Sequence, residues 1–372
     1  MRKIFWIICT LLLSVYFVLA QGDCPSIAEQ AIAAADTLCS DLGRNQACYG
    51  NVLLSAEPQI GVTTLQFEQA GDIADLENIQ SIELSGMNTP TGTWGVAILS
   101  VQANLPDTLP GQNVTFVLFG DVTLENAAEE GQNPMQAFYL RTGIGDSACE
   151  EAPDSGMLVQ TPDGVDSVSF TANGVDVEIG STVFFQAEAE DNMNVSTVEG
   201  TAILDFDGES YPVIAGTWLQ VPMGGELLPT GRPELPQGYE TQRFSRLPTR
   251  VLPREIELAA PLGASELGEL QNRLDQGLPP CDAPGLPACE ELPILGVRDR
   301  TWAPTTQWGI RWEPGVNCAL PDADSSDLPQ CPPAFDLCQG SRLLQDRAIC
   351  GGGSSSRTAQ DIDGDGFPNE ED

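Results

Sequence analysis

Short runs of apolar residues alternating with polar ones occupy the chain from about residue 50 to residue 155. They are separated by Gly, Pro, Asn and Asp, and no helical period lies between them. The runs are NVLLSAEP, TTLQFEQAG, IQSIELSGM, TWGVAILSVQANLP, NVTFVLFGDVTLEN and AFYLRTG. This pattern predicts a mainly β protein with an antiparallel β-sandwich, jelly-roll-like or barrel domain over residues 51–155.

The alternation is clearest between residues 156 and 222, where it predicts a smaller module of β-hairpins. Asn173-Gly174 and Asp207-Gly208 each lie between two alternating runs, and both dipeptides favour the positive φ angles of tight hairpin turns. Stacked hairpins are expected to bury a common set of side chains on one shared face: Phe184, Val198, Ile203, Val213 and Trp218.

Helical spacing appears at two places outside the predicted strands. Residues 24–42 are rich in alanine and end at Gly43, a common helix stop, within a cysteine-tied region at 21–50. The stretch ASELGELQNRLDQG predicts a second short helix. The expected buried positions are Ile27, Ala31, Ala35 and Leu38 in the first helix, and Leu267, Leu270 and Leu274 in the second.

The C-terminal part is irregular and rich in Pro, Gly and Cys. Residues 223–280 have the composition of a Pro-rich linker around the second helix, 281–350 are Cys-rich, and 351–360 are a Gly/Ser linker. Residues 241–257, TQRFSRLPTRVLPREIE, form a basic island in an acidic chain. It serves either as an intramolecular partner for acidic faces or as a docking site for an anionic polymer.

The first twenty residues have the organisation of a secretory signal peptide. Arg2 and Lys3 precede an apolar run from Ile4 to Ala20 that ends in Val-Leu-Ala, which predicts cleavage after Ala20. A membrane anchor is the alternative. No later stretch approaches the ~20 apolar residues that span a bilayer, so we expect no membrane span after cleavage. The expected location is secreted, extracellular or in the cell envelope.

Charge narrows the range of partners and reactions. The formal net charge is −38, with 54 acidic residues against 16 basic ones, so the chain repels nucleic acid and attracts divalent cations. Histidine is absent, which excludes Ser-His-Asp and Cys-His catalysis and imidazole metal sites. A carboxylate-dependent hydrolase remains formally possible, but no spacing singles out a carboxylate pair. We therefore predict no catalytic residues and no enzyme activity.

The cysteines that follow the predicted signal peptide are even in number, as expected for an exported chain that forms disulfides. Zinc is the competing interpretation, but the chain has neither a C-x-x-C pair nor a histidine. A long gap divides the cysteines into a group of four and a group of six, which predicts two separately bridged regions whose pairing stays open. The first group is Cys24, Cys39, Cys48 and Cys149, and the second is Cys281, Cys289, Cys318, Cys331, Cys338 and Cys350.

Three tryptophans lie within or close to the second cysteine group: Trp302, Trp308 and Trp312. Indole rings stack on apolar faces of sugars, so the trio suggests carbohydrate binding. The alternative is that these rings fill a small disulfide-bonded core.

One stretch of the hairpin region resembles a known family. VSTVEGTAIL, followed by Asp207-Gly208 and by VIAGTWLQV, is similar to the β-domain of FecR-type envelope regulators. In that family a glycine turn precedes the last strand, and Gly216 stands at the corresponding place. The resemblance implies a FecR-like module at about 165–222 and, as an alternative function, a sensing or regulatory component of the envelope.

The last twelve residues, DIDGDGFPNEED, have the oxygen spacing of a calcium-binding loop. Gly366 permits the tight turn, and the segment matches the D-x-D-G-D-G-x-P-N-x-x-D string of thrombospondin type 3 repeats, which it resembles. An acidic solubilising tail is the alternative. The expected calcium dissociation constant is on the order of 10⁻⁴–10⁻³ M. The expected ligands are Asp361, Asp363, Asp365, the backbone carbonyl of Phe367, Asn369 and Asp372.

Together these features predict an exported, disulfide-bonded, mainly β protein that acts by binding. The expected partner is a protein or glycan at the cell surface, and calcium is the expected cofactor. The alternatives are a FecR-like regulatory component and a carbohydrate-binding or carbohydrate-active protein.

Overall fold

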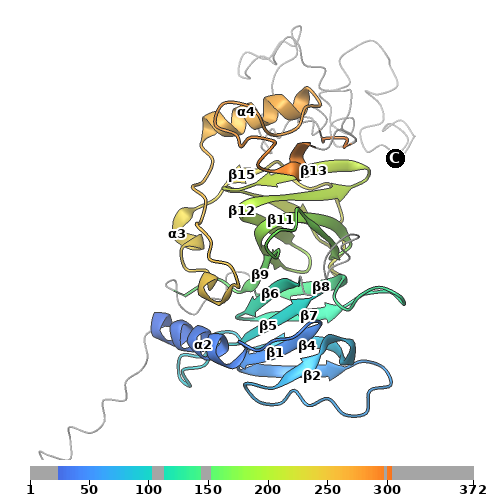
Figure 1. Ribbon diagram of the computed structural model, residues 1–372, viewed down its shortest axis with the longest axis vertical. Helices are drawn as coiled ribbons and strands as arrows, with labels where there is room; N and C mark the ends of the chain where they lie inside the picture. The colour runs from blue at the N-terminus through green and yellow to red at the C-terminus, as the bar shows by residue number, and fades with distance from the viewer. Residues whose placement is uncertain (1–23, 103–112, 144–151, 297–299, 304–372) are drawn as a thin grey trace, which may run out of the picture.

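The computed structural model describes residues 24–102, 113–143, 152–296 and 300–303 (Figure 1). The predicted signal peptide, residues 304–372 with the predicted calcium loop, and Cys149 lie outside these ranges. The described part of the chain is mainly β, with a short helix near its start, which confirms the predicted fold class.

The first eight strands of the described chain are β1 (Gln46–Asn51), β2 (Leu53–Pro58), β3 (Ile73–Asp75), β4 (Ile79–Leu84), β5 (Val96–Val101), β6 (Val114–Phe119), β7 (Val122–Asn126) and β8 (Ala137–Thr142). The remaining strands are β9 (Gly156–Gln160), β10 (Val168–Ala172), β11 (Val175–Ala187), β12 (Asn192–Phe206), β13 (Glu209–Ile214), β14 (Thr217–Pro222) and β15 (Gln237–Gly238). The helices are α2 (Cys24–Leu38), α3 (Thr241–Phe244) and α4 (Ala264–Asp275), with 3₁₀ turns at Leu76–Asn78, Thr249–Val251 and Pro293–Gly296.

All of these strands belong to one curled sheet in which two runs of neighbours are joined by β11. One run is β2-β4-β7-β8-β10 and the other is β9-β6-β5-β1-β3. β11 pairs with β10 along its first half and with β9 along its second half. Strands from both predicted regions, 51–155 and 156–222, therefore share one hydrogen-bonded sheet. The described pairs are antiparallel except for β8 and β10, which run parallel.

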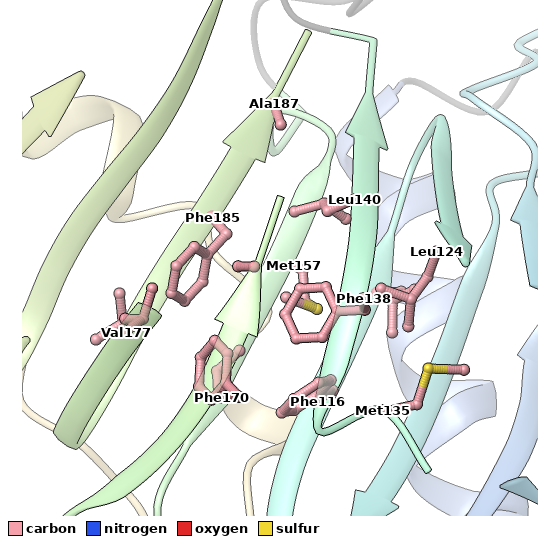
Figure 2. Close-up of a cluster of buried hydrophobic side chains, with 14 of the residues drawn as sticks. Phe116, Leu124, Met135, Phe138, Leu140, Met157, Phe170, Val177, Phe185 and Ala187 are labelled. Atoms are coloured by element: carbon pink, nitrogen blue, oxygen red, sulfur yellow. The ribbon is translucent and has the colours of Figure 1, made fainter. Parts of the chain in front are cut away.

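Side chains from both runs meet in one apolar core. Phe116 of β6 and Phe170 of β10 each lie against Phe138 of β8, with ring centroids 5.5 and 5.4 Å apart. Figure 2 shows these rings together with Met157 of β9 and Phe185 of β11. Burying such rings removes a large apolar area from water, so this cluster stabilises the sheet.

Both hairpins form at the predicted dipeptides. Asn173 and Gly174 have φ angles of 50° and 75°, and Asp207 and Gly208 have 53° and 78°. Positive φ at both central residues is the signature of a type I′ turn. The turns connect β10 to β11 and β12 to β13 in antiparallel register.

The prediction that the hairpins share one buried face is wrong. Val198 and Ile203 both lie outside the main core but in separate clusters, because the register between β11 and β12 shifts at Val198 and interrupts the regular alternation along β12. Val198 packs under α2 and the 239–258 segment, while Ile203 packs near α4. Val213 pairs with Ala202 rather than with Ile203 and therefore joins the main core.

The run at 63–71, predicted as a strand, forms a loop. The Asp72 carboxylate accepts hydrogen bonds from the backbone N–H groups of Glu68 and Gln69, at 2.9 and 3.0 Å, which turns the chain. These bonds lower the pKa of Asp72. Phe67 is buried against Tyr49, so the apolar pattern reflects one anchored ring rather than a strand.

The outer face of β1, β5, β6 and β11 is covered by α2 and by residues 239–258 (Figure 1). α2 buries Ile27, Ala31 and Ala35 as predicted, but it ends at Leu38, whose side chain is 41% exposed. Part of the predicted linker is thus a packed segment rather than a tether. Its buried side chains are Tyr239, Phe244, Leu247, Val251 and Leu252.

A third cluster covers β12 and β13 at the far end of the sheet. α4 buries Leu270 and Leu274, as the spacing predicts, against Ile203 and Ile214. Trp302 is also buried in this cluster. A polar groove lies over β11, β12 and β14, beside β15 and α3.

Candidate functional site

The floor of the groove is made by three strands that hold polar side chains in register. Gln186 of β11 pairs with Asn194 of β12, and Asn194 pairs with Gln220 of β14. These three amides form a row across the sheet. The adjacent row contains Ser196 and Trp218, which also face each other across β12 and β14.

Strand alternation explains why polar groups line this face. The residues between them, such as Val195 on β12 and Leu219 on β14, point into the main core. The three amides therefore lie on the opposite face of the sheet from Val195 and Leu219. One face stabilises the fold, and the other is available to interact with a ligand.

The rim of the groove is formed by β15 and α3 with the residues between them. Tyr239 packs against Phe244 with ring centroids 4.2 Å apart, and Phe244 meets Phe184 of the floor edge-on at 6.1 Å. The Tyr239 hydroxyl donates to the Ala259 carbonyl at 2.5 Å. Burial raises the pKa of Tyr239 to about 12, so the hydroxyl stays protonated at neutral pH. The rim is therefore fixed by aromatic packing.

Floor and rim enclose a cavity of about 340 Å³ lined by Gln186, Asn194, Ser196, Trp218, Gln237, Gly238, Tyr239, Glu240, Arg243 and Phe244. This volume is at the lower end of the range for small-ligand sites, ~300–1,000 Å³. Trp218 is half-buried and lies at the boundary between the aromatic cluster and the cavity.

Some of the amide groups are already used within the protein. The Gln186 amide nitrogen donates to the Ser155 carbonyl at 2.8 Å, and its oxygen accepts from Arg243 at 3.0 Å. Arg243 also pairs with Asp154. These contacts fix the orientation of the Gln186 amide and give the Arg243 guanidinium an acidic partner in Asp154.

Other polar groups in the groove remain open to a ligand. The Gln220 amide donates to the Asn194 side-chain oxygen at 3.2 Å, which leaves the Asn194 amide nitrogen and the Gln220 oxygen without a further bond in the described structure. The Ser196 hydroxyl likewise has no hydrogen bond among the described residues. Ser196 is 4% exposed and Asn194 9% exposed, so a bound ligand can satisfy groups that bulk water reaches poorly.

A second polar cluster, centred on Arg254, fastens the 239–258 segment to the sheet. Arg254 binds both carboxylate oxygens of Glu199, at 2.8 and 2.6 Å. Its backbone N–H and C=O bond to the Gln160 side chain at 2.9 and 3.0 Å. Ser181, held at a φ of 143°, donates to Glu199 at 2.6 Å. These groups satisfy one another's hydrogen bonds, so the role of the cluster is to hold the 239–258 segment on the sheet.

The basic island thus has intramolecular partners. In addition to Arg243 and Arg254, Arg250 lies 3.6 Å from Asp36 of α2. Of the two interpretations of residues 241–257, the described contacts favour the intramolecular one.

Most of the site residues predicted from the sequence lie outside the described residues. This holds for the calcium ligands Asp361, Asp363, Asp365, Phe367, Asn369 and Asp372 and for Cys149, Cys318, Cys331, Cys338 and Cys350. Within the described ranges, no group of three or more His, Cys, Asp or Glu side chains is arranged to hold a metal ion.

Two disulfides are present in the described structure, one in each predicted cysteine group. Cys39 bonds to Cys48 and ties the end of α2 to β1, while Cys281 bonds to Cys289 beside α4. Cys24 is also disulfide-bonded. Trp302 is 4% exposed in the cluster around Cys281, which agrees with the core-filling interpretation for this ring. Trp308 and Trp312 lie outside the described residues.

The sequence prediction missed the groove, although a signal for it was present. In NMNVSTV the polar Asn194 and Ser196 alternate with the apolar Met193 and Val195, and in TWLQVP Gln220 follows Trp218 at the same spacing. Alternation alone identifies a polar face, but the register that aligns the amides is not visible in any single strand.

Comparison with known proteins assigns neither a family nor a function to this chain. No family model matches the chain, and no curated protein matches it. Two crystal structures of a candidate anti-sigma factor from Parabacteroides distasonis ATCC 8503 are similar at 15% identity and a TM-score of 0.26. The match covers 40% of this chain and 62–63% of that protein, which is less than two thirds of its length. None of the described helices combines the length and apolar character needed to cross a membrane.

Proposed function

We propose that this chain is an exported binding protein of the cell surface or envelope, without catalytic activity, that holds its ligand in the groove between β11, β12, β14 and α3. The observation that carries the proposal is the row Gln186, Asn194 and Gln220 beside Trp218. Unused donors and acceptors next to a half-buried indole are the usual features of a ligand site.

Charge and geometry favour binding over hydrolysis in this groove. A glycosidase needs two carboxyl groups about 5–9 Å apart across the scissile bond. Glu240 is the carboxylate of the described lining, and the neighbouring Asp154 is paired with Arg243. Glu199, in the other polar cluster, has a lowered pKa, which does not suit a general acid.

Calcium is the proposed cofactor, held by residues 361–372 through the ligands of the thrombospondin type 3-like string. The disulfides of the described chain agree with passage through an oxidising compartment, where millimolar calcium makes a weak loop useful. The FecR-like stretch at 165–222 leaves an envelope regulatory component as the alternative function. In that case the groove would bind a partner of the signalling complex.

The test uses the full mature chain, labelled and added to intact cells of the organism that produces it. The Trp218→Ala variant is expected to bind about tenfold more weakly, because it loses a large stacking surface. Tyr139→Ala on β8, which removes a half-buried ring elsewhere on the sheet, is the matched control and should bind like the wild type. Equal binding by the Trp218 and Tyr139 variants would show that the groove is not the binding site.

A further inference from the structure

We infer that the groove recognises a short neutral glycan, bound with a pyranose ring on Trp218 and two neighbouring hydroxyls on the Asn194–Gln220 pair. This inference rests on the proposed function and specifies the ligand of the same site.

The open hydrogen-bonding groups match sugar hydroxyls. Each hydroxyl both donates and accepts, so a pair of adjacent hydroxyls needs one donor and one acceptor a short distance apart. The Asn194 amide nitrogen supplies the donor and the Gln220 side-chain oxygen supplies the acceptor, on strands whose paired residues lie about 4.5–5.5 Å apart. The bond from Gln220 to Asn194 fixes which end of each amide faces the ligand. Ser196, in the next row, can donate to or accept from a third hydroxyl.

Trp218 supplies the apolar half of the recognition. One face of a pyranose ring carries mainly C–H groups, which pack on the electron-rich face of an indole. Because Trp218 and Ser196 are cross-strand neighbours, the indole lies beside the polar row. A ring stacked on Trp218 therefore has its edge next to the Asn194–Gln220 pair.

Charge selects a neutral ligand over an anionic one. The chain carries a net charge of −38, and Glu240 is exposed at the rim of the groove. Arg243 is already paired with Asp154 and bonded to Gln186. A uronic acid, sulfated sugar or phosphate would meet a negative field with no free cation among the described lining residues.

The sheet edge beside the groove does not favour a peptide. A peptide that adds as a strand needs free backbone N–H and C=O groups at an edge. On β14 the Gln220 carbonyl already accepts from the Glu234 N–H at 2.6 Å, and the Pro222 carbonyl accepts from the Thr230 N–H at 2.9 Å. β15 pairs with Thr217 and Trp218. These positions of the edge are thus occupied by the chain itself.

The experiment is isothermal titration of the full mature chain with five neutral trisaccharides: maltotriose, cellotriose, xylotriose, mannotriose and chitotriose. At least one is expected to bind. Trp218→Ala and Gln220→Ala should each weaken that binding about tenfold or more, while Trp218→Phe, which keeps a stacking ring, should lose less. Matched controls are Tyr139→Ala and Gln80→Ala, a ring and an amide on other strands. A neutral ligand also predicts little change in affinity between about 0.05 and 0.5 M salt.

The outcomes separate the inference from the proposed function. If none of the five trisaccharides binds, or if trigalacturonic acid binds more tightly than any of them, the neutral-glycan inference is overturned. If, in addition, the wild type still binds cells in a way that depends on Trp218 and is removed by protease treatment of the cells, the ligand is a protein and the proposed function stands. If a trisaccharide binds equally to wild type and Trp218→Ala, the groove is the wrong site and both proposals fail.

Discussion

Arg254 and Glu199 form a bidentate ion pair that joins the 239–258 segment to β12, with nitrogen–oxygen distances of 2.8 and 2.6 Å. The segment carries Tyr239, Arg243 and Phe244, which make the rim of the groove. The ion pair therefore supports the rim but does not line the groove. Breaking it should lower the stability of the protein, and it should change ligand binding only through the position of the rim.

Glu199 gives the first prediction, which concerns pH. Desolvation by burial raises the pKa of Glu199, but bonds from Arg254, Ser181 and Thr182 outweigh it, and the pKa is lowered overall from 4.5. A lowered pKa in the folded state stabilises the protein above the unfolded-state pKa, and this contribution is lost as the pH falls through the folded-state value. The free energy of unfolding, measured with urea between pH 7 and pH 3, should therefore decrease at the acid end.

The variant Glu199→Gln isolates this contribution. At pH 7 it should lower the free energy of unfolding by about 1–3 kcal/mol, because hydrogen bonds to a charged group are lost. It should also lose less stability than the wild type between pH 5 and pH 3. Glu57→Gln, at an exposed position on β2, is the control and should follow the wild-type pH profile. An unchanged profile for Glu199→Gln would contradict the assigned role of the ion pair.

The second prediction concerns the hairpin turns. Gly174 and Gly208 have positive φ, so valine at either position should lower the free energy of unfolding by roughly 1–3 kcal/mol. The effect should be larger at Gly174, where a Cβ atom would lie 2.8 Å from Leu228, than at Gly208, where nothing lies within 4 Å. Thermal or urea unfolding measures both.

Gly268 is the matched control for the glycine variants. It lies within α4 with open space around the Cβ position. Gly268→Ala should be neutral or stabilising by up to ~1 kcal/mol, because alanine loses less backbone entropy in a helix. Equal effects at Gly208 and Gly268 would mean that positive φ is not what the turn requires.

The hairpins and α4 were predictable because their signals are local. Asn-Gly and Asp-Gly favour the backbone angles of the turn, and the spacing of Leu270 and Leu274 places both on one face of a helix. Neither prediction depends on where distant segments of the chain lie.

The groove was not predictable in this way because it depends on register. Gln186, Asn194 and Gln220 come from three strands, and a slip of one residue would turn an amide into the core. The packed 239–258 segment was predicted as part of a linker because prolines, which it contains, are typical of linkers. Its own signal was the recurrence of Phe244, Leu247 and Val251 every three or four residues.

The third prediction concerns the disulfides. Cys39 pairs with Cys48, and Cys24 is bonded, so the division into two cysteine groups predicts a Cys24–Cys149 bridge. Mass spectrometry of peptides from the non-reduced secreted protein should find this bridge, Cys281–Cys289 and no free thiol. A bridge from Cys149 to the 281–350 group would contradict the division.

The fourth prediction concerns calcium. Asp365→Ala should abolish calcium binding to the full chain in a calorimetric titration, because it removes a central oxygen ligand. Glu370→Ala removes one carboxylate from the same segment at a position that is not a predicted ligand, and it should bind calcium like the wild type. Magnesium should compete poorly, since it requires a small octahedral shell.

Deleting residues 351–372 should leave the melting temperature of the β-fold unchanged, because a Gly/Ser tether transmits no packing. Calcium heat that is the same for Asp365→Ala and the wild type would indicate diffuse counter-ion binding to a chain of net charge −38.

The central claim is that a ligand binds on Trp218 beside the Asn194–Gln220 pair, and indole N–H signals in a ¹H–¹⁵N NMR titration test it most directly. Trp218 is assigned by the signal that Trp218→Phe removes, and Trp94, which is 1% exposed beneath the outer face, is the internal reference. With the tightest-binding neutral trisaccharide, the Trp218 signal should move while the Trp94 signal stays in place, and Gln220→Ala should shift the titration to higher concentration. A saturating trisaccharide that leaves the Trp218 signal unmoved would contradict the claim.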